Sequence, residues 1–169
     1  MVFEIVLIIL AYLIPLYVAN ATPIIFHGTI PVDFGKKYAG ERILGKGKTI
    51  LGALCGILGG TFAGIIFYDI APQVLVLIPT YFSLIIVLAM GGIIGDMAKS
   101  FLKRRKGIES GGKWFLVDQL DFIVGGLILS LVVRLPEVEV VLFLLIVTVF
   151  IHMVTNVIAF KLKLKRVPW

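Results

Sequence analysis

The sequence predicts an all-α integral membrane protein with five transmembrane helices, an N-terminus outside the cell and a C-terminus in the cytoplasm. Of the 169 residues, 60% are hydrophobic and only 15% are charged, whereas soluble domains are about 25% charged. The apolar residues gather in five segments that approach the ~20 residues needed to cross a bilayer. The length suits a single domain covering residues 1–169.

The five predicted spans follow one another with charged connections between them. In chain order they cover residues 2–20, 50–68, 74–95, 118–134 and 139–160. The first has no basic region before it and no small-residue cleavage site after it, so we expect a retained helix rather than a signal peptide. The fourth is short and begins with two aspartates, so its start should lie at the membrane interface.

The second span carries a stripe of small residues. Glycines recur there at four-residue spacing, at Gly52, Gly56, Gly60 and Gly64. This spacing puts them on one face of a helix and favours close helix packing in lipid. The alternative interpretation is a groove for an acyl or isoprenyl chain.

The basic residues predict the orientation. The segment between the first two spans holds five Lys and Arg residues, the segment 96–117 holds six, and the tail from residue 161 holds four. Arg134 is the only one elsewhere. With five spans these three regions share one face, which the positive-inside rule assigns to the cytoplasm. Basic residues in short loops between apolar spans indicate topology and contact with anionic lipid or substrate phosphates, not nucleic acid.

Three aspartates at the edges of apolar segments are the candidate catalytic residues: Asp96, Asp118 and Asp121. Carboxylates at such positions are costly unless a cation pairs with them. Mg²⁺ prefers oxygen ligands and usually binds one or two carboxylates together with substrate phosphates. We therefore expect Mg²⁺ as cofactor, with Asp96 and Asp118 as ligands and Asp121 as a further ligand or orienting group. Helix capping is the alternative for the last two, although it explains one carboxylate more easily than two.

The residues after Asp96 share its helix face if the helix continues beyond the membrane. The positions i, i+3, i+4, i+7 and i+8 are Asp96, Lys99, Ser100, Lys103 and Arg104. One face would then present a carboxylate, a hydroxyl and several cations. We expect Ser100, Lys103 and Arg104 to bind nucleotide phosphates. A cluster of positive charge that stops translocation would explain the cations but not Asp96. Arg105 and Lys106 should point elsewhere, towards anionic lipid.

The loop before the second span ends in Gly45-Lys-Gly-Lys48-Thr49. Free N–H groups and the helix dipole favour phosphate at a helix start, so Lys48 and Thr49 are further nucleotide-binding candidates. A P-loop is excluded because its first glycine would fall at Arg42. A basic loop facing lipid headgroups is the alternative. Asp33, in a rigid turn, and Arg42 are expected to border the nucleotide or the lipid phosphate.

Polar residues also occur in the last span. His152 and Asn156 are four residues apart, with Thr148 one turn earlier. Such residues most often form hydrogen bonds between helices. Asn156 lies near the cytoplasmic end and is a candidate for the border of the site.

The motif set resembles a known family. Ser100-x-x-Lys103-Arg104, a spacer, Gly111-Gly112 and then Asp118-x-x-Asp121 is similar to the signature of the integral-membrane CTP-dependent cytidylyltransferases that make CDP-diacylglycerol. This chain departs from that signature twice: Gln119 stands where those proteins have Arg, and Leu-rich sequence replaces a His before the glycines. The chain is also much shorter than those proteins. Both departures fit the archaeal CDP-archaeol synthase family, which the chain resembles over essentially its whole length, including Pro31-x-Asp33-Phe-Gly35 and Gly45-x-Gly47-Lys48-Thr49.

The resemblance implies that CTP and 2,3-bis-(O-geranylgeranyl)-glycerol 1-phosphate react to give a CDP-activated ether lipid and pyrophosphate. CTP, this isoprenoid lipid and the surrounding membrane lipids are then the expected partners, and no protein partner is implied. A CDP-alcohol phosphatidyltransferase is one alternative, but its D-x-x-D-G motif is broken by Phe122. A small membrane transporter would need polar residues through several spans, and a scaffold would not need three interfacial aspartates.

Overall fold

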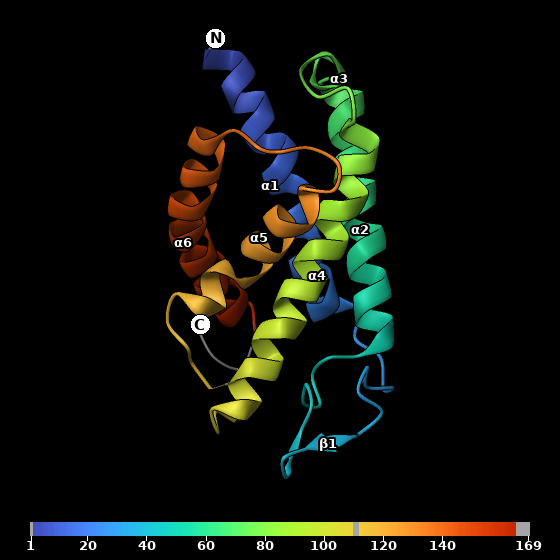
Figure 1. Cartoon of the computed structure of the whole chain (residues 1–169), viewed down its shortest axis with the longest axis vertical. Helices are drawn as coiled ribbons and strands as arrows, with labels where there is room; N and C mark the ends of the chain where they lie inside the picture. Colours follow the sequence, from blue (N-terminus) through green and yellow to red (C-terminus); the bar gives the residue numbers. More distant parts are fainter. Residues whose placement is uncertain (1, 110–111, 165–169) are drawn as a thin grey trace.

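Six α-helices and one short hairpin make up the part of the chain that the computed structural model describes, residues 2–109 and 112–164 (Figure 1). The elements are α1 (Val2–Ile25), β1 (Lys37–Tyr38), β2 (Glu41–Arg42), α2 (Ile50–Ile70), α3 (Val74–Leu77), α4 (Tyr81–Arg105), α5 (Val117–Ser130) and α6 (Val138–Lys161). Gly111, Lys165 and Arg166, which entered the sequence interpretation, lie outside the described residues.

Within the described ranges, four helices are long and apolar enough to cross a membrane: α1, α2, α4 and α6. The prediction of a helical, multi-pass membrane protein is therefore confirmed. The predicted span 118–134 corresponds to α5, which has 14 residues. At 1.5 Å per residue this helix is about 21 Å long, shorter than the ~30 Å hydrocarbon core.

The predicted span 74–95 has different ends in the structure. The single turn of α3 stops before Pro79, and the long helix α4 starts only at Tyr81. Proline disfavours the helical conformation in the residue before it, and Ile78 has φ −132° and ψ 85°. At its other end α4 continues to Arg105, with three basic residues in its last turn that suit the helix dipole. Asp96 and Arg104 therefore belong to one continuous helix, as the predicted helix face requires.

The glycine stripe of α2 packs against neighbouring helices. A Cβ atom at Gly60 would lie 2.6 Å from the carbonyl oxygen of Pro15 in α1, and one at Gly64 would lie 2.7 Å from Ile85 in α4. The stripe is filled by protein at these positions. The packing interpretation is therefore confirmed in preference to a lipid groove.

α4 and α5 approach each other even more closely. A Cβ atom at Gly95 would overlap the carbonyl oxygen of Asp121, and one at Gly125 would overlap that of Gly91. On the other side of α5, the Phe122 ring meets the Tyr17 ring of α1 edge to face, with centroids 5.1 Å apart. The glycine contacts hold the first turns of α5 against the middle of α4.

The hairpin β1–β2 is attached to the end of α4 by Arg105. Its guanidinium donates to the backbone carbonyls of Tyr38, Glu41 and Arg42, and it lies 5.2 Å from the centroids of the Tyr38 and Phe101 rings. The expectation that Arg105 points to anionic lipid is therefore wrong. The hairpin carbonyls offer it a set of acceptors that a sequence pattern does not reveal.

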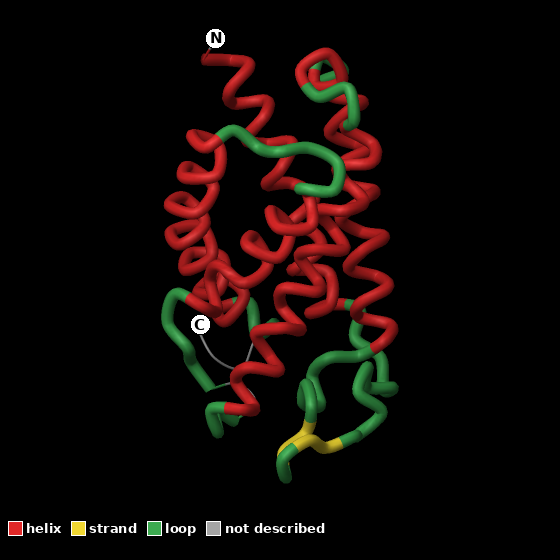
Figure 2. Tube along the Cα trace, in the orientation of Figure 1, coloured by secondary structure: helices red, strands yellow, loops and turns green. Residues whose placement is uncertain are grey.

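The connections separate to the two ends of the bundle. The loop with the hairpin and the loop between α4 and α5 gather at one end, where α6 also finishes (Figure 2). The N-terminus of α1, α3 and the connection between α5 and α6 lie at the opposite end (Figure 1). The basic segments between predicted spans are therefore together at one end.

Candidate active site

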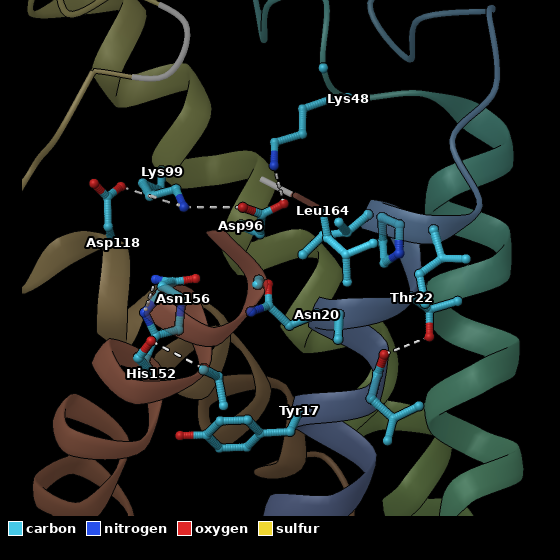
Figure 3. A pocket seen from close by; sticks show the side chains of 18 of the residues that line it. Tyr17, Asn20, Thr22, Lys48, Asp96, Lys99, Asp118, His152, Asn156 and Leu164 are labelled. Atoms are coloured by element: carbon cyan, nitrogen blue, oxygen red, sulfur yellow. Dashed lines mark hydrogen bonds and ion pairs between the residues drawn. The ribbon is translucent and has the colours of Figure 1, made fainter. Parts of the chain in front are cut away.

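A cavity of about 800 Å³ opens at the end of the bundle where the basic loops gather. Its charged wall comes from the loop before α2, from α4 and from α5 (Figure 3). The charged residues in this wall are Lys48, Asp96, Lys99, Lys103 and Asp118. The opposite wall is formed by the last two turns of α1 and by α6 and is mainly apolar.

Lys99 stands at the centre of the charged wall. Its Nζ lies 3.1 Å from Asp96 Oδ1, 3.6 Å from Asp118 Oδ1 and 2.6 Å from Asp121 Oδ2. Figure 3 shows the ammonium between the carboxylates of Asp96 and Asp118. The structure thus brings together the three aspartates that the sequence singled out, although Asp121, at 3% side-chain exposure, lies behind the wall.

One further lysine is paired at each side of this centre. Lys48 reaches from the loop to Asp96, and Lys103 Nζ lies 2.7 Å from Asp118 Oδ1. Lys103 also donates to the Gly112 carbonyl at 2.5 Å. Three lysines and three aspartates therefore balance in charge. An anionic ligand can bind these lysines only if another cation then pairs with the carboxylates, or if each lysine keeps part of its contact with its aspartate.

The loop before α5 is folded onto the same carboxylate. Trp114 N donates to Asp118 Oδ2 at 2.7 Å, while Oδ1 faces Lys103. At the start of α5, Asp118 is therefore held both by Trp114 of the preceding loop and by Lys103 of α4. A capping side chain accepts from an N–H group in the first turn of its helix. Asp118 instead accepts from Trp114 N, which lies before α5, so capping alone does not explain this residue.

A smaller cavity of about 190 Å³ lies beside the large one. It is lined by Leu44, Gly47, Lys48, Lys99, Ser100, Lys103 and Arg104. The two cavities share Gly47 and the three lysines, so these cations separate them. The Ser100 hydroxyl donates to the Asp96 carbonyl at 2.9 Å, within α4. Ser100 and Arg104 therefore border this cavity, and their contact with a nucleotide stays a prediction.

The opposite wall also carries polar side chains, here called the polar band: Asn20 of α1 and His152 and Asn156 of α6. His152 Nδ1 and the Asn156 amide are 2.9 Å apart on α6, and Asn20 of α1 points towards them (Figure 3). Asn156 lines the cavity, and its place at the border of the active site stays a prediction. The sequence interpretation missed Asn20 and did not select Lys99 as a site residue. Two features of the sequence could have indicated these residues. Asn20 is an amide at the end of an apolar span, and Lys99 shares a helix face with Asp96.

The Thr49 hydroxyl is engaged in hydrogen bonds within the protein. Its Oγ1 accepts hydrogen bonds from Gly52 N and Gly28 N, both at 3.2 Å, and it caps the start of α2. Among the described residues that line the two cavities, Thr49, Asp33 and Arg42 do not occur. Their predicted roles in ligand binding stay without structural support.

Asp33 organises the loop that carries Lys48. Its carboxylate, 1% exposed, accepts from Arg42 at 2.5 Å and from the backbone N–H groups of Gly35, Leu44 and Gly45 at 3.0–3.2 Å. Burial alone would raise the pKa of Asp33, but the hydrogen bond from Arg42 and the three backbone bonds outweigh it and lower the pKa from 3.8 to about 2. The carboxylate is therefore bound most tightly in its charged form.

Asp33→Asn is expected to destabilise the protein by about 2 kcal/mol near neutral pH. Because the folded-state pKa is lowered, the contribution of Asp33 is complete above its ordinary pKa of 3.8 and disappears as the pH falls towards about 2. Thermal unfolding of both proteins in detergent, from pH 7 to pH 2, measures this difference. The exposed Glu41→Gln in the same loop is the control. A difference that stayed constant down to pH 2 would contradict the charged-form explanation.

Membrane-length helices around a cavity walled by lysines and aspartates define a multi-pass membrane protein with a site suited to a phosphate-bearing ligand. The family model described as "CarS-like: CDP-archaeol synthase" matches residues 2–169, and this chain belongs to that family.

Curated relatives named CDP-archaeol synthase agree. The protein of Methanospirillum hungatei is 40% identical over 166 residues, covering 93% of this chain and 100% of the relative. The protein of Pyrococcus horikoshii is 38% identical, covering 94% of each chain. The chain is also similar to a solved structure described as "an intramembrane enzyme for archaeal membrane lipids biosynthesis", with a TM-score of 0.79 and 35% identity, covering 88% of this chain and 92% of that one. The resemblance drawn from the motifs is therefore confirmed.

Proposed function

We propose that this chain transfers CMP from CTP to 2,3-bis-(O-geranylgeranyl)-glycerol 1-phosphate, which forms CDP-archaeol and releases pyrophosphate. Family membership supports this activity. The structural observation that carries it is one cavity with a wall of lysines and aspartates on one side and a mainly apolar wall on the other. The triphosphate of CTP needs the charged wall, and the isoprenoid chains of the lipid need the apolar wall beside it. The CDP-alcohol phosphatidyltransferase and transporter alternatives are not favoured.

The triphosphate is assigned to the charged wall. Lys48, Lys103 and Arg104 would contact its oxygens, since their side chains border the small cavity or both cavities. Lys48 is paired with Asp96 and Lys103 with Asp118. Lys48 and Lys103 line both cavities, so their side chains can turn towards a phosphate there without crossing an apolar region.

The lipid is assigned to the wall formed by α1 and α6. Its apolar lining includes Val18, Ile24, Phe26, Ala159 and Leu164. Asn20 and Asn156 lie next to the charged side chains of Asp96 and Lys99 on the side of α1 and α6 (Figure 3). The glycerol phosphate would sit at the polar band and the isoprenoid chains along the apolar lining. The chains would then leave the site sideways into the membrane.

In the reaction, an oxygen of the lipid phosphate forms a bond to the α-phosphorus of CTP. The bond from the α-phosphorus to the oxygen bridging to the β-phosphorus breaks, and pyrophosphate leaves with that electron pair. A phosphate monoester is largely dianionic near neutral pH because its second pKa is about 6. The attack therefore needs no strong general base. The protein positions the two phosphates and neutralises their charge.

The donor set fits a magnesium ion. The carboxylates of Asp96, Asp118 and Asp121 converge on one cationic atom within 3.6 Å, and carboxylate oxygens are the donors that Mg²⁺ prefers. Asp96 and Asp118 would hold the ion, with Asp121 as a further ligand or orienting group. Among the described residues, no three or more His, Cys, Asp and Glu side chains are grouped so that they could hold a metal ion. The protein would therefore supply two carboxylates, as is usual for Mg²⁺ bound together with substrate phosphates. Substrate phosphates would complete the coordination, and the ion would supply neutralisation of their charge.

The five-span topology, with the N-terminus outside and the active site on the cytoplasmic face, is part of the same proposal. α5 runs from the end with the basic loops towards the other end, and residues 131–137 continue from it before α6 returns (Figure 1). The short α5 and this connection would together form the fifth crossing. The gathering of the basic loops at one end supports this arrangement.

The test is transfer of label from α-³²P-CTP into organic-extractable lipid by purified protein in detergent with Mg²⁺. Parallel reactions contain the unsaturated archaeal ether-lipid phosphate, phosphatidic acid or no lipid. We expect label only with a lipid phosphate, most with the ether lipid, and none after addition of EDTA. Folded protein that labels neither lipid would refute the proposed activity.

A further inference from the structure

Lys99 has more anionic partners than the two lysines beside it. Its Nζ lies within 3.6 Å of carboxylates from both α4 and α5, whereas Lys48 and Lys103 each pair with one aspartate. Its side chain is 14% exposed. The ammonium therefore occupies the point on which the three carboxylates converge.

This position differs from that of a lysine waiting for phosphate. A lysine ammonium is a compact point charge, and it competes directly with a metal ion for the same carboxylate oxygens. For a divalent cation to bind Asp96 and Asp118 together, the ammonium of Lys99 has to move away. A free metal ion offers this ammonium no new partner, but a triphosphate does.

We propose that Lys99 is a built-in cation that occupies the divalent-cation position until nucleotide arrives, so that the metal enters only together with the triphosphate. This inference rests on the proposed function. In the arrangement that the structure shows, Lys99 holds the carboxylates of α4 and α5 together. When the triphosphate enters, its oxygens accept hydrogen bonds from the Lys99 ammonium. The ammonium then leaves the carboxylates, which become free to bind the metal. Lys99 is therefore a positioning residue that couples metal binding to nucleotide binding.

Removal of the Lys99 charge should expose the metal position. In Lys99→Met the wall keeps Asp96, Asp118 and Asp121 but loses the shared cation. Metal alone should then bind at least about tenfold more tightly than to the wild-type protein, in the range by which groups next to a metal ligand change affinity. Lys99→Arg retains the charge and should bind metal alone as weakly as the wild type.

The experiment uses Mn²⁺ as the probe, because the loss of its free-ion electron paramagnetic resonance signal reports binding without nucleotide or lipid. Full-length wild type, Lys99→Met and Lys36→Met are titrated in detergent; the last removes an equal charge from an exposed loop position. Tight Mn²⁺ binding by Lys99→Met alone is the expected result. Equal affinity of wild type and Lys99→Met, or an equal gain in Lys36→Met, would overturn the proposal.

Two further variants keep the test decisive. Lys99→Gln also removes the charge and serves if Lys99→Met does not fold. The double substitution Lys99→Met with Asp121→Asn restores the charge balance and should lose much of the gained affinity; full retention would refute the shared position. Since these titrations contain no substrate, they are separate from turnover. Wild-type protein that labels lipid, with no gain in Lys99→Met, refutes the role of Lys99 alone, whereas absence of labelling refutes the activity.

Discussion

Replacement of Asp118 by asparagine is expected to lower the rate of CDP-lipid formation by about 100-fold or more, with the helix bundle intact. Asp118 faces Lys103 at 2.7 Å and also accepts from Trp114 N at 2.7 Å. Asparagine has the same shape and keeps one acceptor oxygen, so one of these contacts survives. It has no negative charge, so it cannot hold a metal ion or balance Lys103 while the phosphates bind.

The measurement combines label transfer from CTP with a thermal unfolding midpoint for each protein. Glu109→Gln removes an exposed carboxylate from the loop that precedes α5 and should retain nearly all activity. Equal losses in both variants would point to the net charge of this region and not to a specific role of Asp118. Near-normal turnover of Asp118→Asn with Mg²⁺ would contradict the assignment of Asp118 as a metal ligand.

The sequence was most informative where one helix carries the pattern. The helix face from Asp96 to Arg104 follows from spacing alone, and α4 continues to Arg105 as that face requires. The glycine stripe of α2 was likewise interpreted correctly, because four-residue spacing reports on packing within one helix. In these cases the local period of the helix determines which residues are neighbours.

The sequence was less informative where contacts join distant segments. Asp33 looked like a presented ligand, but its carboxylate accepts bonds from four groups of its own loop. Arg105 looked like a lipid contact, yet it binds a hairpin more than sixty residues earlier in the chain. The central position of Lys99 depends on how α5 docks on α4. Such contacts follow from tertiary packing, which the period of one helix does not encode.

The docking of α5 on α4 leads to the second large effect, that of Gly95→Ala. An added Cβ would overlap the Asp121 carbonyl oxygen and lie 3.0 Å from Gly125 Cα. Both neighbours are backbone atoms, so no side-chain rotation relieves the clash and the helices have to separate. We expect a loss of about 1–3 kcal/mol in stability, and a loss of activity larger than this destabilisation explains. The activity falls further because Asp118 and Asp121 would move away from Asp96 and Lys99.

Gly92→Ala is the matched control, one turn earlier on the same helix. There the nearest atom to an added Cβ is the end of the flexible Leu16 side chain, at 3.2 Å, and the Asp121 carbonyl is not among its close neighbours. Alanine also favours a helix interior by about 1 kcal/mol over glycine, so this variant should keep its unfolding midpoint and its activity. The same gain in propensity applies to Gly95→Ala, so a difference between the two variants measures the helix contact alone. If Gly95→Ala kept both its unfolding midpoint and its rate of label transfer, close approach of α4 and α5 would not be what brings the carboxylates together.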